Sequence, residues 1–132
     1  MANRRVLAIG HDWRIRILIR ANLEALGLEV QGAVNGHHNL QLLGEDKPDL
    51  ILLETDLLDI EFTQLLDHLQ AQLGGQVPII VISAELPSRR LRTNGHAVSY
   101  LLKPFAIPAL LQKVEQALSS IPGDRGPTAD GG

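Results

Sequence analysis

The sequence contains no cysteine and very few aromatic residues. Among its 132 residues there are two Phe, one Trp and one Tyr, so aromatic side chains make up 3% of the chain. The lack of cysteine excludes disulfides and thiolate chemistry and is compatible with a reducing cytoplasm. The scarcity of aromatic rings argues against a flavin site or a base-stacking platform for single-stranded nucleic acid.

The chain also has little excess charge and no long apolar run. Its formal net charge is −3, which gives no sign of a nucleic-acid-binding surface. The apolar stretch after Arg4 and Arg5 is too short for a signal peptide, and no segment approaches the length of a membrane span. We therefore expect one cytoplasmic domain over residues 1–120. Residues 121–132 are rich in Gly and Pro, and we expect a disordered tail or linker stub there.

Short apolar runs alternate with segments of helical periodicity along the chain. Near-continuous apolar runs are typical of parallel strands buried on both faces. The expected strands cover residues 4–9, 28–34, 49–54, 77–83 and 97–102. The expected helices cover residues 13–26, 36–45, 60–73, 87–94 and 107–119. This alternation predicts a doubly wound α/β domain of flavodoxin-like type, with five strands in the order 2-1-3-4-5 and five helices.

The first and last helices have apolar faces that predict which side chains point inward. In the first helix the helical spacing selects Ile15, Leu18, Ile19, Asn22, Leu23 and Leu26. In the last helix it selects Leu110, Leu111, Val114 and Leu118. Gly27 is expected to end the first helix.

Polar residues stand where four of the expected strands end. In open parallel sheets, ligand chemistry gathers beyond the carboxyl ends of the strands. We therefore expect these polar residues and their neighbours to form one pocket around Glu54. Its expected members are Gly10, His11, Asp12, Asp56, Ser83, Ala84, Lys103 and Pro104.

Three motifs carry a resemblance to a known family. They are Tyr100–Phe105, Ser83-Ala84 after an apolar strand, and Pro48–Leu53 leading to residue 54. On these motifs, residues 4 to about 119 resemble the receiver domain of bacterial response regulators. The resemblance implies phosphoryl transfer from a histidine kinase to an aspartate after the third strand, with Mg²⁺ held by that aspartate and an acidic pair.

The resemblance also assigns roles to individual residues. Ser83 and Lys103 match the hydroxyl and the lysine that contact the phosphoryl group, and Tyr100 matches an aromatic that rotates on activation. It further implies a cis peptide bond between Lys103 and Pro104. The acceptor position, however, holds Glu54 in place of Asp, and Gly10 and His11 replace the acidic pair.

These replacements leave one carboxylate, Glu54, opposite one ammonium, Lys103. We expect the two to form an ion pair, with no cofactor and with Mg²⁺ binding weak or absent, because Mg²⁺ prefers several oxygen ligands. The extra carbon of Glu moves its carboxylate outward by about 1.5 Å, toward the place of a phosphoryl group. Glu54 is therefore expected either to mimic the phosphorylated state in part or to serve only as a structural ion-pair partner.

The sequence thus predicts a non-enzymatic, phosphorylation-independent receiver domain that acts through protein contacts in two-component signalling. A working phosphoacceptor that uses Glu54, Asp12 or Asp56 is an alternative, and so is a small-molecule-binding flavodoxin-like domain. Expected partners are a histidine kinase or a downstream signalling protein, without direct contact to nucleic acid or membrane. The family implies a homodimer through the fourth helix, fifth strand and last helix. The candidate partner surface consists of Arg89, Arg90 and Arg92.

Overall fold

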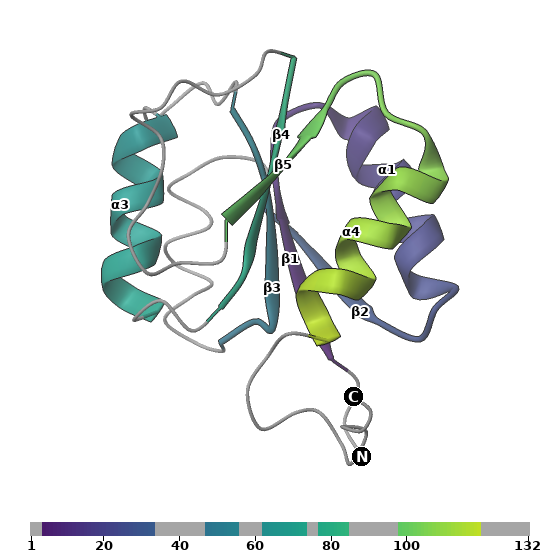
Figure 1. Ribbon diagram of the computed structural model, residues 1–132, viewed down its shortest axis with the longest axis horizontal. Helices are drawn as coiled ribbons and strands as arrows, with labels where there is room; N and C mark the ends of the chain where they lie inside the picture. The colour runs from purple at the N-terminus through teal and green to yellow at the C-terminus, as the bar shows by residue number, and fades with distance from the viewer. Residues whose placement is uncertain (1–3, 34–46, 56–61, 74–76, 85–97, 120–132) are drawn as a thin grey trace.

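A five-stranded parallel sheet runs through the centre of the computed structural model, which describes residues 4–33, 47–55, 62–73, 77–84 and 98–119 (Figure 1). Its strands are β1 (Arg5–Ile9), β2 (Glu29–Ala33), β3 (Leu50–Glu54), β4 (Ile79–Ser83) and β5 (Val98–Leu102). All neighbouring pairs are parallel and the order is β2-β1-β3-β4-β5. The predicted flavodoxin-like sheet and its strand order are therefore confirmed.

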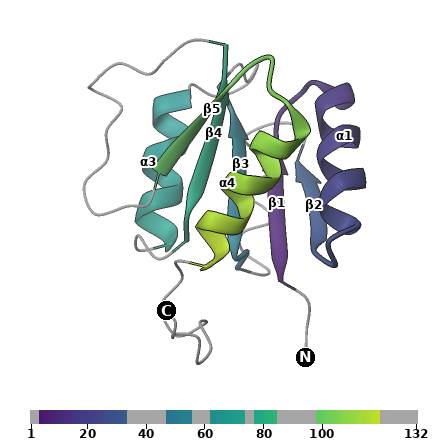
Figure 2. The same ribbon diagram turned by 45° about the vertical axis from the view of Figure 1, so that its right-hand side comes forward.

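Helices cover both faces of the sheet. The described residues contain α1 (Trp13–Glu24), α3 (Phe62–Leu73) and α4 (Ile107–Ser119). Helices α1 and α4 lie on one face and α3 lies on the other (Figures 1 and 2). The structure thus shows three of the five predicted helices, since the segments 36–45 and 87–94 lie outside the described residues. No helix in the described part of the chain is both long and apolar enough to cross a membrane.

Alternation along the strands divides the core into two layers. On β1, Val6 packs toward α1 and α4, whereas Leu7 packs toward α3. Side chains of a strand point to opposite faces in turn, so a strand covered by helices on both sides is apolar at every position. All five residues of β3 are buried, including Glu54 at its end. This central position explains why the only break in the apolar run of β3 comes at its last residue.

Two details of α1 differ from the predicted pattern. The helix ends at Glu24, and Gly27 adopts a left-handed conformation with φ 88° three residues later. Only Ile19 and Leu23 are fully buried in this helix, while Leu18 and Leu26 are 40% and 48% exposed. The helix packs on the sheet through a narrow stripe at i, i+4 spacing, and Leu26 lies beyond its end. The predicted inward positions of Leu18 and Leu26 were therefore wrong.

In α4 the predicted inward face is present, with one exception. Leu110, Val114 and Leu118 are buried, as the spacing predicts. Leu111 is only partly buried and packs at the edge of the same core. Positions 110, 114 and 118 repeat every four residues and lie on one line along the helix, from which residue 111 is displaced.

Candidate functional site

Backbone hydrogen bonds tie together the residues that follow the strands. Gly10 N–H donates to Ala33 O at 3.0 Å, and Lys103 N–H donates to Ser83 O at 2.8 Å. Because Ile9 is in register with Leu53, the next residues of β1 and β3 in the ladder are Gly10 and Glu54. The carboxyl edge of the sheet thus places Gly10, Glu54, Ser83 and Lys103 on neighbouring strands.

The Glu54 carboxylate is turned toward β1. Glu54 is 2% exposed, and no other charged residue of the described ranges is buried. A Cβ atom built on Gly10 would lie 2.7 Å from Glu54 Cγ, 2.5 Å from Cδ, and closer still to Oε1. Real Cβ atoms essentially never approach another heavy atom within 3.0 Å. The side chain of Glu54 therefore occupies the volume that a side chain at position 10 would need.

Lys103 supplies positive charge from the other side of Glu54. Lys103 Nζ lies 4.0 Å from Glu54 Oε2, so the predicted ion pair is present. This distance is longer than a direct hydrogen bond. At such a separation the Coulomb attraction is about 4 kcal/mol with an effective dielectric constant near 20, before the desolvation of both groups is subtracted. The peptide bond between Lys103 and Pro104 is cis, as the family implies.

Arg16, which was not among the predicted pocket residues, also lies at this site. Its Nη1 donates to Gly10 O at 2.7 Å. Its side chain crosses β2 at Gly32, where an added Cβ would lie 3.5 Å from Arg16 Cδ. A cavity of about 10 Å³ lies beside the residue, and such a volume holds about one water molecule. Its lining consists of Ala8, Ile9, Gly10, Ile15, Arg16, Ile19, Leu52, Glu54 and Ile82.

Asp12 caps helix α1. Its Oδ1 accepts a hydrogen bond from Arg14 N–H at 3.1 Å and lies 3.6 Å from Arg14 Nε. Burial acts to raise the pKa of Asp12, but the Arg14 N–H, the charge of Arg14, the Ile15 N–H and the charge of Lys103 together lower the pKa below its usual value. The carboxylate is therefore used to start the helix.

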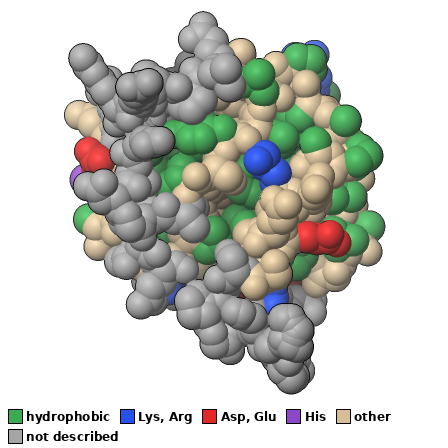
Figure 3. Space-filling model, in the orientation of Figure 1, with side chains coloured by type: hydrophobic (Ala, Val, Ile, Leu, Met, Phe, Trp, Pro, Cys, Tyr) green, Lys and Arg blue, Asp and Glu red, His purple; other side chains and the backbone are tan. Residues whose placement is uncertain are grey.

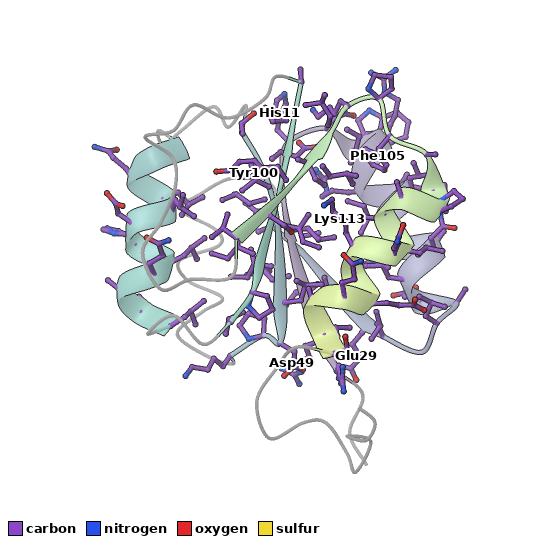
Figure 4. All side chains as sticks on the ribbon, viewed as in Figure 1. His11, Glu29, Asp49, Tyr100, Phe105 and Lys113 are labelled. Carbon is purple, nitrogen blue, oxygen red and sulfur yellow. The ribbon has the colours of Figure 1, made fainter. Side chains whose placement is uncertain are left out.

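The other predicted residues surround this arrangement. His11 is exposed at the turn between β1 and α1 (Figure 4). Ser83 is half-buried at the end of β4, whereas Ala84 and Pro104 are exposed. Tyr100 is half-buried on the α3 side of the sheet, and burial raises the pKa of its hydroxyl. The remaining four predicted residues, Asp56, Arg89, Arg90 and Arg92, lie outside the described residues.

The described residues bring together no set of acidic side chains of the kind that a resident divalent cation needs. Across residues 4–33, 47–55, 62–73, 77–84 and 98–119, no group of three or more His, Cys, Asp or Glu side chains is placed to hold a metal ion. Gly10 has no side chain, Asp12 caps α1, and Glu54 already faces Lys103. The described residues therefore do not fit Mg²⁺, which requires several oxygen ligands in octahedral geometry.

Comparisons with known proteins agree with this architecture. The model of the response regulator receiver domain family matches residues 6–115. Response regulator MprA of Mycobacterium sp. (strain KMS) is 28% identical over 125 residues, 93% of this chain and 54% of MprA. Transcriptional regulatory protein PrrA of Mycobacterium tuberculosis (strain ATCC 25618 / H37Rv) is 30% identical over 116 residues, 86% of this chain and 49% of PrrA. The chain thus spans about half the length of these curated relatives.

A solved structure extends the likeness to three dimensions. The receiver domain of the Francisella response regulator 1452 superposes with a TM-score of 0.75 at 28% identity, covering 89% of this chain and 98% of that domain. The family match covers most of the chain. This chain belongs to the response regulator receiver domain family of two-component signalling proteins.

Proposed function

We propose that this receiver domain is a non-enzymatic protein–protein signalling module that works without phosphorylation of residue 54. The observation that carries the proposal is the position of the Glu54 carboxylate, which is buried between Gly10 and Lys103. Phosphoryl transfer requires an in-line approach of the donor and a metal ion that offsets the developing charge. A carboxylate turned toward β1 in a pocket that does not fit Mg²⁺ meets neither requirement.

The same position favours a structural role for Glu54 over mimicry of the phosphorylated state. The longer side chain was expected to carry the carboxylate outward, to the place of a phosphoryl group. Instead, the side chain bends sideways over Gly10 and is 2% exposed. Its charge then lies among the ends of β1, β3 and β5, where it holds these strand ends in one arrangement.

Receiver domains of this family pass signals through contacts with histidine kinases or effector proteins. For this chain we propose such a protein partner in the cytoplasm, with no direct contact to nucleic acid or membrane. The face formed by β5 and α4 carries few charged side chains among the described residues (Figure 3) and includes Leu102, which is 42% exposed. A weakly charged face suits a protein contact, including a homodimer, because charged residues are depleted at the centre of such interfaces.

Intact mass after incubation with acetyl phosphate and Mg²⁺ tests the proposal. We expect no adduct on the native chain, with a Glu54→Asp variant measured alongside to show whether the acceptor residue alone restores the reaction. A stoichiometric adduct on the native chain that is stable to acid and labile to base would contradict the proposal. Locating that adduct on Glu54, Asp12 or Asp56 would then establish the alternative, a working phosphoacceptor.

A further inference from the structure

The pocket of this chain differs from a cation-binding pocket in where its oxygen atoms are directed. Glu54 places its carboxylate against the α-carbon of Gly10, and Lys103 Nζ lies 4.0 Å from its Oε2. The carbonyl oxygen of Gly10 accepts a hydrogen bond of 2.7 Å from Arg16 Nη1. Both residues at the junction of β1 and β3 therefore direct oxygen atoms toward cationic side chains of the chain itself.

We infer that Gly10 and Glu54 form a mutually dependent pair, and that this pair keeps a divalent cation out of the pocket. A side chain at position 10 and a glutamate at position 54 require the same volume, because the added Cβ would overlap Glu54 Oε1 and lie 2.5 Å from Cδ. With Glu54 in the conformation that the structure shows, the pocket has no room for an acidic side chain at position 10. This inference rests on the proposed function and gives a physical reason why the pocket does not fit a divalent cation.

The backbone at Gly10 does not itself require glycine. Within the described ranges, Gly27 is the glycine with a positive φ, so the conformation at Gly10 is open to other residues. Close approach of Glu54 is the constraint that the structure shows at this position. The need for glycine should therefore disappear when residue 54 is shortened.

Arg16 strengthens the exclusion of a cation from the β1 side. Its guanidinium is partly buried and lines the same cavity as Glu54. Arg16 lines the cavity beside Glu54, and Lys103 Nζ lies 4.0 Å from Glu54 Oε2, so a divalent cation bound at Glu54 would meet two positive charges. Repulsion between like charges in a partly buried site is weakly screened by salt. A cation can thus bind only when an acidic pair at positions 10 and 11 offsets these charges. Glu54 occupies the space of the side chain at position 10.

The test restores an acidic pair in two backgrounds and measures Mn²⁺ binding by titration calorimetry on the full chain. The two variants are Gly10→Asp/His11→Asp with Glu54 retained, and the triple variant Gly10→Asp/His11→Asp/Glu54→Asp. The control is Gln31→Glu/Gln112→Glu, which adds the same two negative charges at exposed positions of β2 and α4. Thermal melting of each protein shows whether the added side chains are accommodated.

We expect the triple variant to bind Mn²⁺ at least tenfold more tightly than the native chain and the control. The double variant with Glu54 should melt below the triple variant and gain no more Mn²⁺ affinity than the control. Equal Mn²⁺ affinity and equal melting temperature in the double and triple variants would overturn the inference, as would a triple variant no better than the control. These outcomes do not depend on phosphorylation of the native chain, which tests the proposed function separately.

Discussion

Replacing Gly10 by Ala should destabilise the native chain although its backbone conformation accepts alanine. Gly10 does not have a positive φ, so the change by itself should stabilise the fold by about 0.4–1 kcal/mol through the entropy of the unfolded chain. The new methyl group, however, would lie 2.7 Å from Glu54 Cγ and 2.5 Å from Cδ. Overpacking of this kind typically costs about 1–3 kcal/mol, and we expect that cost to prevail.

The same change should be harmless when Glu54 is shortened. Glu54→Ala removes Cγ, Cδ and Oε1, the three atoms that the methyl group would meet. In that background Gly10→Ala should be neutral or stabilising, which gives a coupling free energy of at least about 1 kcal/mol between the two positions. Gly32→Ala is a matched control, because its methyl group would lie at an ordinary 3.5 Å from Arg16 Cδ.

Urea denaturation followed by far-ultraviolet circular dichroism measures the free energy of unfolding of all four members of the cycle and of the control. Circular dichroism is preferred to fluorescence because the single tryptophan, Trp13, is 60% exposed and changes its surroundings little on unfolding. An equal effect of Gly10→Ala in both backgrounds would refute the reasoning. So would a more stable Gly10→Ala variant of the native chain.

Three further predictions concern the charged residues around the pocket. Arg16→Gln should lower the free energy of unfolding by about 1 kcal/mol more than Arg20→Gln. Both arginines donate a hydrogen bond to a backbone carbonyl, but only the hydrogen bond of Arg16 is partly buried. Urea denaturation of the two variants measures the difference. Lys103→Gln should lower the free energy of unfolding by about 2 kcal/mol, because it leaves the charge of a buried carboxylate less compensated. Glu54→Gln removes that charge and should lower the free energy of unfolding by less. Equal reductions in the two variants would contradict this prediction. The lowered pKa of Asp12 means that its ionised form stabilises the fold above pH 3.8, and that this contribution is lost as pH falls through the folded-state pKa; Asp12→Asn, which can still cap α1, should therefore show a weaker loss of stability in acid.

The sheet could be predicted from sequence because its determinants are local. Apolar runs such as Val6–Ile9 and Leu50–Leu53 mark strands buried on both sides, and the handedness of crossovers leaves few strand orders. The ends of these strands then bring Glu54 and Lys103 together without further information. The cis bond before Pro104 came from the family resemblance, since no local pattern specifies it.

The direction of side chains could not be predicted in the same way. Periodicity identifies a face of a helix but not its depth, so Leu18 was assigned to the core although it is 40% exposed. The outward displacement expected for Glu54 treated its side chain as extended, whereas the absence of a side chain at Gly10 lets it bend sideways. Arg16 was not assigned to the pocket because its side chain passes over Gly32, a residue of a neighbouring strand that has no side chain of its own.

The shared volume of residues 10 and 54 also favours one order of substitution at these two positions. If an ancestor carried a side chain after β1, a change to Glu54 before the change to Gly10 would have placed two groups in the same space. The reverse order passes through a protein with glycine at position 10 and a shorter residue at position 54, in which nothing overlaps. Gly10 is thus the permissive substitution, and a return to aspartate at position 10 carries an energetic cost for as long as Glu54 keeps the conformation described above.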